Sequence, residues 1–236
     1  MLDAFLRQLL GALCHQLPER SLLVQGVPLP LCARCTGLHV AAAFTMLALY
    51  AQRGTRRRAG LPESPLCWVL AGLALAWLVD GLNSTLADVA GWSLYTPSNL
   101  LRLLSGIGVG VALGLCLYPL LVGALGRTAE SVAIARRTTA LFGPVLAAFG
   151  GLALVCSIPW VVGRTLLLAL CALSMLAAAN GLVLAPLARP WGTRRWLAVR
   201  YWALGTSAAL GEIVLLGLAR HWLAAGVLLE VGAIHR

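Results

Sequence analysis

The chain of 236 residues is 60% hydrophobic and only 11% charged, with a net charge of +10 at neutral pH. A soluble domain of this size carries about a quarter charged residues. The composition therefore excludes an ordinary soluble protein and predicts an integral membrane protein surrounded by the lipid bilayer. The positive charge does not indicate a nucleic-acid partner, because the arginines stand in short clusters between apolar runs.

The first residues, MLDAFLRQLLGAL, predict a short amphipathic helix. They are too short and too interrupted for a secretory signal peptide, so we expect this helix to remain in the protein. Six apolar runs follow, each long enough to cross a bilayer as a helix, which takes about 20 residues. The runs are continuous rather than alternating, which favours helices over a β-barrel. We expect the spans at about 33–52, 65–84, 99–122, 138–160, 164–187 and 196–219.

These runs predict an all-α fold, a polytopic transmembrane helix bundle that forms one membrane domain. Its expected parts are an N-terminal Cys/His segment at 1–34, a six-helix bundle at about 35–219 and a tail at 220–236. The tail is too short to cross the bilayer again and is expected to lie at the membrane interface.

The arginines predict the orientation of the bundle. The loops after the first, third and fifth spans, which contain RGTRRR, GRTAESVAIARR and ARPWGTRR, hold four, three and three arginines. Loops rich in basic residues tend to stay in the cytoplasm. The sequence thus predicts a multi-pass protein of the inner (cytoplasmic) membrane with its N-terminus outside.

The segment before and at the start of the first span concentrates thiol and imidazole groups. Cys14 and His15 are adjacent, and Cys32 and Cys35 form a CxxC pair further along. If a helix begins near Cys32, then Cys32, Cys35 and His39 lie on one face of it. The connecting segment contains three prolines and a glycine, which predict a turn or an extended loop. Such a loop is expected to fold Cys14 and His15 back against the Cys32/Cys35 helix end.

Three interpretations of this cluster stay open. Thiolates and imidazoles suit a zinc, iron or copper ion, with Cys14, His15, Cys32 and Cys35 as ligands. A CxxC pair at a helix N-terminus also suits thiol–disulfide exchange, because the helix dipole and a nearby arginine stabilise a thiolate. A structural disulfide is the third interpretation. Residues expected to surround and orient the ligands are Glu19, Arg20, Arg34 and His39, the last of which is more typical of an interior histidine than of a ligand.

The stretches CHQLPERS and PLCARCTGLHV resemble the signature of a widespread prokaryotic family of polytopic membrane proteins described only as a domain of unknown function. The family pattern runs approximately C-H-x-x-P-x-R-S and then C-x-R-C-x-G. The later stretches DGLN at 80–83 and NLLRLLSG at 99–106 are similar to further family features. The resemblance covers about the first half of the chain and implies a membrane architecture and a site, but no reaction. The matching residues of the signature are Cys14, His15, Pro18, Arg20, Ser21, Cys32, Arg34, Cys35 and Gly37.

Charged residues inside apolar runs are a second signal. Asp80 lies near the end of the second span and Arg102 near the beginning of the third, so one short loop brings them to the same side. Charges at that depth are costly unless they are paired. We therefore expect an Asp80–Arg102 ion pair with Asn83 and Asn99 as hydrogen-bonding neighbours, unless both charges snorkel to the headgroups. This pair is expected on the same face as the cysteines, where the two groups could form one pocket.

Two further features lie deeper in the apolar runs. Glu212 falls well inside the sixth run, and Asn180 lies in the fifth. An intramembrane carboxylate is typical of a proton or cation pathway, unless it lies close enough to a helix end to reach water. Gly106, Gly110 and Gly114 follow one another at four-residue spacing, which favours close helix packing within the bundle.

The sequence leaves the reaction, and whether the protein is an enzyme, open. The leading hypothesis is an integral membrane protein with a Cys/His metal site at the membrane surface. The alternatives are a membrane thiol–disulfide oxidoreductase that uses Cys32 and Cys35 with Cys14 as the resolving partner, or a disulfide-stapled accessory subunit of a larger membrane complex. The sequence contains no nucleotide-binding loop, nucleophile elbow or HExxH motif, so no nucleotide partner is expected.

Overall fold

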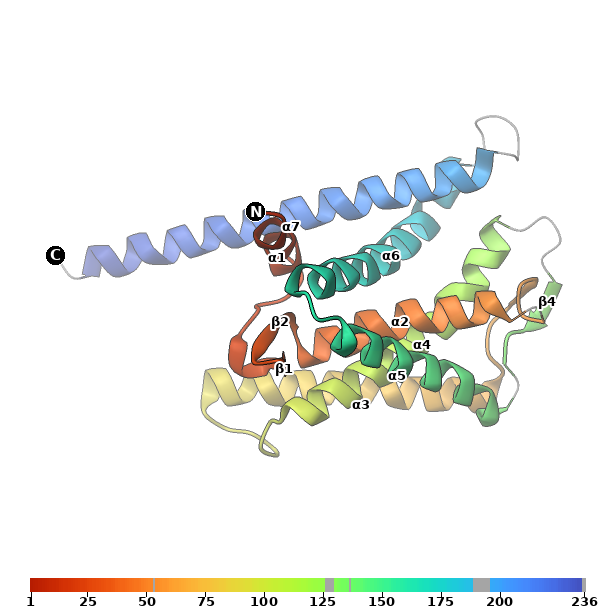
Figure 1. Ribbon diagram of the computed structural model, residues 1–236, viewed down its shortest axis with the longest axis horizontal. Helices are drawn as coiled ribbons and strands as arrows, with labels where there is room; N and C mark the ends of the chain where they lie inside the picture. The colour runs from red at the N-terminus through yellow and green to blue at the C-terminus, as the bar shows by residue number, and fades with distance from the viewer. Residues whose placement is uncertain (53, 126–129, 136, 189–195, 235–236) are drawn as a thin grey trace.

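The computed structural model describes residues 1–52, 54–125, 130–135, 137–188 and 196–234, with the side chains of the last helix described to residue 222. The described chain is a bundle of long helices with two very small sheets, which confirms the predicted all-α polytopic fold (Figure 1). The long helices are α2 (Ala33–Ala51), α3 (Ser64–Ala90), α4 (Asn99–Leu125), α5 (Phe142–Ser157), α6 (Val161–Ala188) and α7 (Leu197–Ile234).

The N-terminal segment folds as a helix followed by a β-hairpin. Helix α1 (Leu2–Gly11) buries Leu6 and Leu10 and leaves polar residues outside, as the amphipathic pattern predicts. A 3₁₀ turn, η1 (Pro18–Arg20), leads into strands β1 (Ser21–Val24) and β2 (Val27–Cys32), which pair antiparallel. Gln25 and Gly26, at φ 54° and 77°, make the tight two-residue turn between them.

A second small sheet and another 3₁₀ turn lie at the opposite end of α2. Strand β3 (Arg58–Gly60) pairs in parallel with β4 (Glu130–Ala133), and η2 (Thr138–Leu141) precedes α5. These elements come from the arginine-rich loops after α2 and α4. The remaining arginines of the loops used to predict the orientation lie outside the described residues: Arg53, Arg127, Arg136, Arg189, Arg194 and Arg195.

Within the described residues, five helices are long and apolar enough to cross a membrane, where six spans were expected. They are Ser64–Ala90, Asn99–Leu125, Thr138–Ser157, Val161–Pro186 and Leu197–Trp222. Helix α2 is not among them, because Arg34, His39 and Thr45 reduce its apolar character. It lies instead in the middle of the bundle, where it packs against α4, α5 and α6. Since protein rather than lipid surrounds it, it can keep buried polar side chains.

The glycine stripe of α4 brings α2 and α4 close together, as its spacing predicts. A Cβ added at Gly106 would strike the carbonyl oxygen of Arg34, and one at Gly114 would lie 2.7 Å from Cβ of Thr45. Gly37 makes the reciprocal contact, since a Cβ there would lie 2.6 Å from the carbonyl oxygen of Leu103. The first turns of α2 are therefore fixed against α4 by backbone-to-backbone packing.

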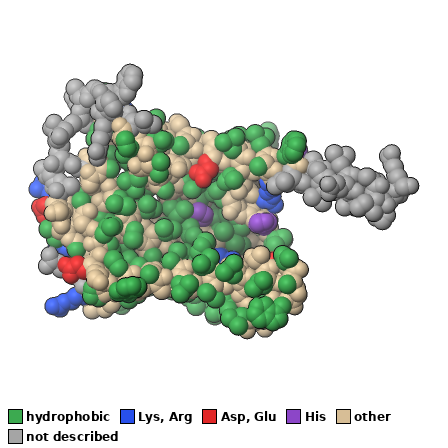
Figure 2. Space-filling model, turned by 180° about the vertical axis from the view of Figure 1, so that it is seen from behind, with side chains coloured by type: hydrophobic (Ala, Val, Ile, Leu, Met, Phe, Trp, Pro, Cys, Tyr) green, Lys and Arg blue, Asp and Glu red, His purple; other side chains and the backbone are tan. Residues whose placement is uncertain are grey.

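The last long helix extends into the residues predicted as the tail. Helix α7 continues without a break from Leu197 to Ile234, so the expected interfacial tail at 220–236 begins as part of the last long helix (Figure 1). No proline interrupts the sequence at this point, which explains why the helix does not stop near 219. Hydrophobic side chains cover much of the face shown in Figure 2, and many large hydrophobic residues are exposed, as a bundle that contacts lipid requires.

Candidate functional site

Three of the four predicted ligands converge at the start of α2. Cys14 follows α1, Cys32 ends β2 and Cys35 lies in the first turn of α2. Their sulfur atoms all lie within 4.8 Å of one another. Cys14 is buried, and Cys32 and Cys35 are half-buried. We refer to these three residues as the cysteine cluster.

The β-hairpin explains how residues so far apart in the chain meet. Strand pairing places Ser21 opposite Cys32, so the chain returns to the level of η1 before α2 begins. The side-chain amide of Gln16 then joins the two ends of the segment, donating to the carbonyls of Arg7 at 2.7 Å and Pro30 at 2.9 Å. Gln16 has a φ of 55°, a left-handed conformation that turns the chain sharply after Cys14. The predicted fold-back is thus a hairpin with a specific turn before it.

Backbone amides point at the sulfur atoms of the cluster. The N–H of Cys32 donates to Sγ of Cys14 at 3.2 Å, and the N–H of Cys35 donates to Sγ of Cys32 at 3.5 Å. Cys32 is thereby the N-cap of α2. Hydrogen bonds from the thiols of Cys32 and Cys35 lower the pKa of Cys14 well below its usual range. The same hydrogen bond to Cys14 raises the pKa of Cys32. Because the backbone N–H of Cys32 also donates to Sγ of Cys14, the arrangement favours the thiolate form of Cys14.

The two histidines lie outside this group. His15 is exposed, and the convergent ligand set contains only the three cysteines. His39 is buried one turn beyond Cys35, and its Nδ1 has no hydrogen-bond partner among the described residues. The expected convergence of four side chains is thus reduced to three.

Arg34, between the two cysteines of the CARC stretch, forms a buried ion pair with Asp80 of α3. Its Nε donates to Oδ2 of Asp80 at 2.8 Å, and its Nη2 contacts the same oxygen. Nη2 also donates to the Asp80 carbonyl and to Oγ of Ser84, both at 2.9 Å. Asp80 further accepts from the hydroxyls of Tyr95 at 2.9 Å and Ser105 at 3.3 Å. The cysteine-bearing end of α2 is therefore anchored to α3.

This arrangement shows that the predicted Asp80–Arg102 ion pair is wrong. Arg102 is buried on α4, but its Nη1 donates to Oδ1 of Asn99 at 3.0 Å rather than to the carboxylate. Arg34 takes its place because the glycine contacts hold the start of α2 against α4, within reach of α3. The expectation that the charged pair lies on the same side as the cysteines is confirmed, since Asp80 and the cysteines lie at the same end of the bundle and Arg34 joins them.

The two asparagines have different roles. The side chain of Asn83 fixes the loop after α3, accepting from the N–H of Leu94 at 2.6 Å and donating to the Tyr95 carbonyl at 2.9 Å. Asn99 donates to the carbonyl of Glu19 at 2.9 Å and so connects α4 to the N-terminal segment. The loop and the hairpin are thus joined at one end of the bundle.

The remaining residues expected to orient the ligands are Glu19 and Arg20. The side chain of Glu19 is exposed, and only its backbone is used. Arg20 forms an ion pair with Asp88 near the end of α3, and this hydrogen bond raises the pKa of Arg20. Arg20 therefore ties η1 to α3 rather than facing the sulfur atoms.

One stretch of the chain matches a known protein family. Residues 14–116 match the family model described as "Predicted membrane protein (DUF2085)". The match confirms the resemblance to a membrane protein family of unknown function. Together with the five long apolar helices, it identifies the chain as a multi-pass membrane protein. No curated protein and no solved structure matches the chain.

The DUF2085 region, residues 14–116, contains the whole cysteine cluster and its Arg34–Asp80 anchor. Two arginines from beyond this region hold the cluster segment from the other side. Arg164 of α6 is 2% exposed and donates to the Val24 carbonyl at 2.7 Å, at the hairpin turn. Arg220 of α7 donates to the Cys14 carbonyl at 3.1 Å. Sequence reasoning missed both arginines, although charges at the ends of apolar runs are a signal of partners.

The deep carboxylate of α7 lies away from the DUF2085 region. Glu212 is exposed on the surface of the described bundle and accepts a hydrogen bond of 3.0 Å from Nδ2 of Asn180 on α6. The two polar groups expected in the fifth and sixth spans are therefore partners of one another. Neither residue belongs to the cysteine cluster.

Proposed function

We propose that Cys14, Cys32 and Cys35 bind a soft transition metal ion, of the zinc, iron or copper type, at the end of the membrane bundle. The observation that carries this proposal is the convergence of three sulfur atoms within 4.8 Å of one another. In a tetrahedral zinc–thiolate site the sulfur atoms lie about 3.8 Å apart, given zinc–sulfur bonds of about 2.3 Å. A small inward movement of the three side chains produces that geometry.

The surroundings of the cluster also suit a metal–thiolate site. Backbone N–H groups donate to Sγ of Cys14 and Sγ of Cys32, and such contacts stabilise the negative charge of bound thiolates. The Arg34–Asp80 pair fixes the first turn of α2, which carries Cys35. Ligands held by rigid supporting contacts bind a metal more tightly than ligands on a free loop.

The fourth coordination position has two candidates. His15 follows Cys14 directly, and its exposed side chain would have to turn inward; a ligand from solvent is the alternative. The variant His15→Ala distinguishes the two candidates. Loss of the metal would identify His15 as the fourth ligand, and retention of the metal would identify a ligand from solvent.

Thiol–disulfide exchange is the second candidate, because the cluster stabilises a thiolate on Cys14. In such a reaction the Cys14 thiolate attacks a substrate disulfide, and one substrate thiolate leaves. Cys32 or Cys35, as a thiolate, then displaces the second substrate thiolate from Cys14. The cluster ends with one disulfide, and the substrate ends with two thiols. A stable disulfide without turnover would instead fit a stapled accessory subunit of a larger complex.

We also propose that the cluster faces the outside of the inner membrane. The arginine-rich segments after α2 and α4, which hold Arg57 and Arg137 among others, lie at the other end of α2 from the cysteines. The bias of basic residues toward the cytoplasm then puts the cysteine cluster on the outer side.

The deciding experiment is elemental analysis of the full chain purified in detergent. We expect one metal ion per chain in the unaltered protein and its loss in Cys32→Ser. The matched control is Cys67→Ser, because Cys67 is an exposed cysteine outside the cluster. That variant should retain the ion.

Thiol alkylation followed by mass spectrometry, with and without reductant, completes the test. A metal-free protein with a disulfide inside the cluster would replace the metal proposal with the redox one. A metal-free protein in which all three thiols react would overturn both proposals.

A further inference from the structure

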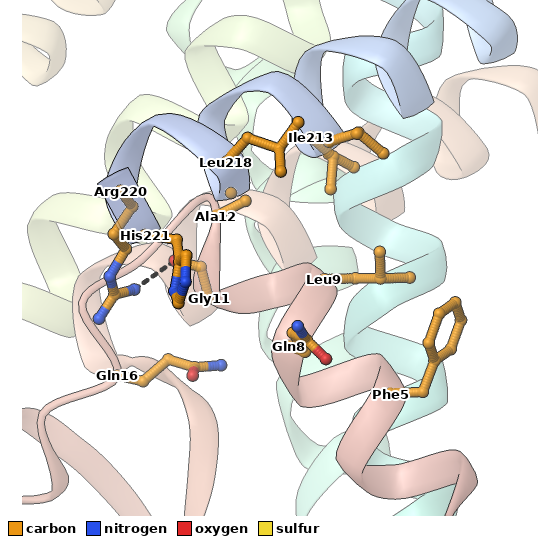
Figure 3. Close-up of a pocket in the computed structure, with 12 residues that line it drawn as sticks. Phe5, Gln8, Leu9, Gly11, Ala12, Gln16, Ile213, Leu218, Arg220 and His221 are labelled. Carbon is orange, nitrogen blue, oxygen red and sulfur yellow. Dashed lines mark hydrogen bonds between the residues drawn. The ribbon is translucent and has the colours of Figure 1, made fainter. Parts of the chain in front are cut away.

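A cavity of about 690 Å³ lies between α1 and α7, and none of the cluster cysteines lines it (Figure 3). Its volume is within the range of sites that bind small molecules, about 300–1,000 Å³. Phe5, Leu9 and Ala12 line it from α1 and the turn after it, and Ile213 and Leu218 line it from α7. Most of its wall is therefore apolar.

Most of the polar residues of the cavity gather at one end, and Gln8 lies apart from them beside Leu9. Figure 3 shows Arg220, His221 and Gln16 on one side of the cavity and the apolar side chains of Phe5 and Leu9 on the other. The cavity is thus amphipathic along its length. A ligand that matches it has a polar head and an apolar tail.

The polar end carries a positive charge that no described carboxylate neutralises. Arg220 donates to the carbonyls of Gly11, Cys14 at 3.1 Å and His15 at 3.5 Å, which fixes the position of its guanidinium. Carbonyl groups orient the guanidinium but do not cancel its unit charge. Among the described residues no acidic side chain pairs with Arg220, and none lines the cavity. The acid closest along α7, Glu212, contacts Asn180 instead.

We propose that this cavity binds an anionic membrane lipid, with the phosphate at Arg220 and His221 and an acyl chain along the apolar wall. The position in the fold supports this occupant. Arg220 and His221 directly follow the apolar run at 196–219, and basic residues at the end of such a run are typical of the region where a helix meets the headgroups. The exposed Trp222 beside them is typical of the same interface.

A pair of glycines on α7 allows a matched test. A Cβ added at Gly217 would meet only Cβ of Ala12, at 3.9 Å, so a larger side chain there fills the cavity without striking backbone. Gly211 lies on the same helix outside the cavity, and a Cβ added there meets nothing within 4 Å. Gly217→Leu therefore blocks the proposed site, and Gly211→Leu is its control.

The experiment titrates the full chain in detergent with phosphatidylglycerol, with phosphatidylcholine and with glycerol phosphate, and measures binding together with the melting temperature. We expect phosphatidylglycerol to bind about fivefold more tightly than phosphatidylcholine because its net charge complements Arg220. Glycerol phosphate alone should not bind, because it has no chain to bury. Gly217→Leu should weaken phosphatidylglycerol binding about tenfold, whereas Gly211→Leu should leave it unchanged.

A second variant protects the test against misfolding. Gln8→Glu puts a negative charge at an exposed position of the lining and should weaken phosphatidylglycerol binding, with an unchanged melting temperature in lipid-free detergent. Equal binding of the two phospholipids, or full binding by both variants, would overturn the proposal. Binding of glycerol phosphate as tight as that of the lipid would show a simple anion site instead. The metal content of Gly217→Leu should match that of the unaltered protein, so this test is independent of the cysteine cluster.

Discussion

Arg34 connects the cysteine cluster to the rest of the bundle through a single side chain. It stands between Cys32 and Cys35 in the sequence, and its guanidinium binds the carboxylate and carbonyl of Asp80 and the hydroxyl of Ser84. A planar guanidinium presents five donors in a fixed fork that suits such a multiple contact, whereas a lysine ammonium has three donors on one nitrogen. Arg34 thus has a structural role, which is to anchor α2 to α3, in addition to the thiolate stabilisation expected from the sequence.

Breaking this ion pair should cost far more than breaking the exposed one nearby. Asp80→Asn removes the buried counter-charge of the half-buried Arg34 and should lower the free energy of unfolding by about 3 kcal/mol. Asp88→Asn makes the same chemical change at the partner of Arg20, on the surface, and should have little effect. Denaturant titration of both variants in detergent measures the difference. Equal losses of stability would contradict the buried pair.

For single residues, the sequence predicts which side chains meet within one short segment better than it predicts which side chains of different helices pair. The meeting of Cys14 with Cys32 and Cys35 follows from a short turn-rich segment, so it could be predicted. The partner of Asp80 could not, because it depends on how α2, α3 and α4 are rotated about their axes. Arg34 and Arg102 both lie at the correct end of the bundle, and only the packed structure distinguishes them.

Among the elements, α2 and α4 form the closest pair, and the start of α2 depends on it. Gly106 lies against the backbone of Arg34, and Gly37 lies against the backbone of α4. A side chain at either position would push the start of α2, which carries Cys35, away from α4. The position of the cysteine cluster is therefore set by glycines that have no chemistry of their own.

The variant Gly106→Ala tests this dependence. Its Cβ would overlap the carbonyl of Arg34, so we expect a loss of about 2 kcal/mol in the free energy of unfolding. Gly72→Ala is the matched control on α3, where a Cβ meets nothing within 4 Å, and it should be neutral or slightly stabilising. Thermal unfolding followed by tryptophan fluorescence would measure both. A Gly106→Ala protein as stable as the control would contradict the close approach of α2 and α4.

Hydropathy predicts the existence of the long helices, but it predicts neither the surroundings of α2 nor the last residue of α7. The polar residues of α2 lower its hydropathy, so it is not one of the five candidate spans. Hydropathy does not show that other helices surround α2. The expected sixth span ends at about 219, whereas α7 continues as a helix to Ile234, because apolar length alone does not stop a helix. Capping or a proline would have been needed to end it near 219.

For the molecule as a whole, the N-terminal segment is held by both halves of the chain. Arg20 and Arg34 contact α3, Arg164 of α6 contacts the hairpin turn, and Arg220 of α7 contacts the Cys14 carbonyl. Thr165 of α6 adds a hydrogen bond of 2.6 Å to Asp3 in α1. The cysteine cluster is thus enclosed by helices that the match to residues 14–116 does not include.

The proposed orientation has a direct test on intact cells. Leu94→Cys places a thiol at an exposed site of the loop after α3, which should face outward with the cluster. Arg57→Cys places one at an exposed site in the loop after α2, which should face the cytoplasm. A membrane-impermeant maleimide should label the first variant above the background of the unsubstituted protein and should label the second only after permeabilisation. The reverse pattern would invert the topology.

The contact between Arg220 and the Cys14 carbonyl joins residues 206 positions apart. Translation delivers the hairpin and the CARC stretch early, but the ribosome must complete the final helix before Arg220 can close over Cys14. Until synthesis ends, Cys14 is part of a nascent chain in which the hydrogen bond from Arg220 has not yet formed. Whatever first reaches the cysteines, whether ion or oxidant, can therefore arrive before the protein is finished.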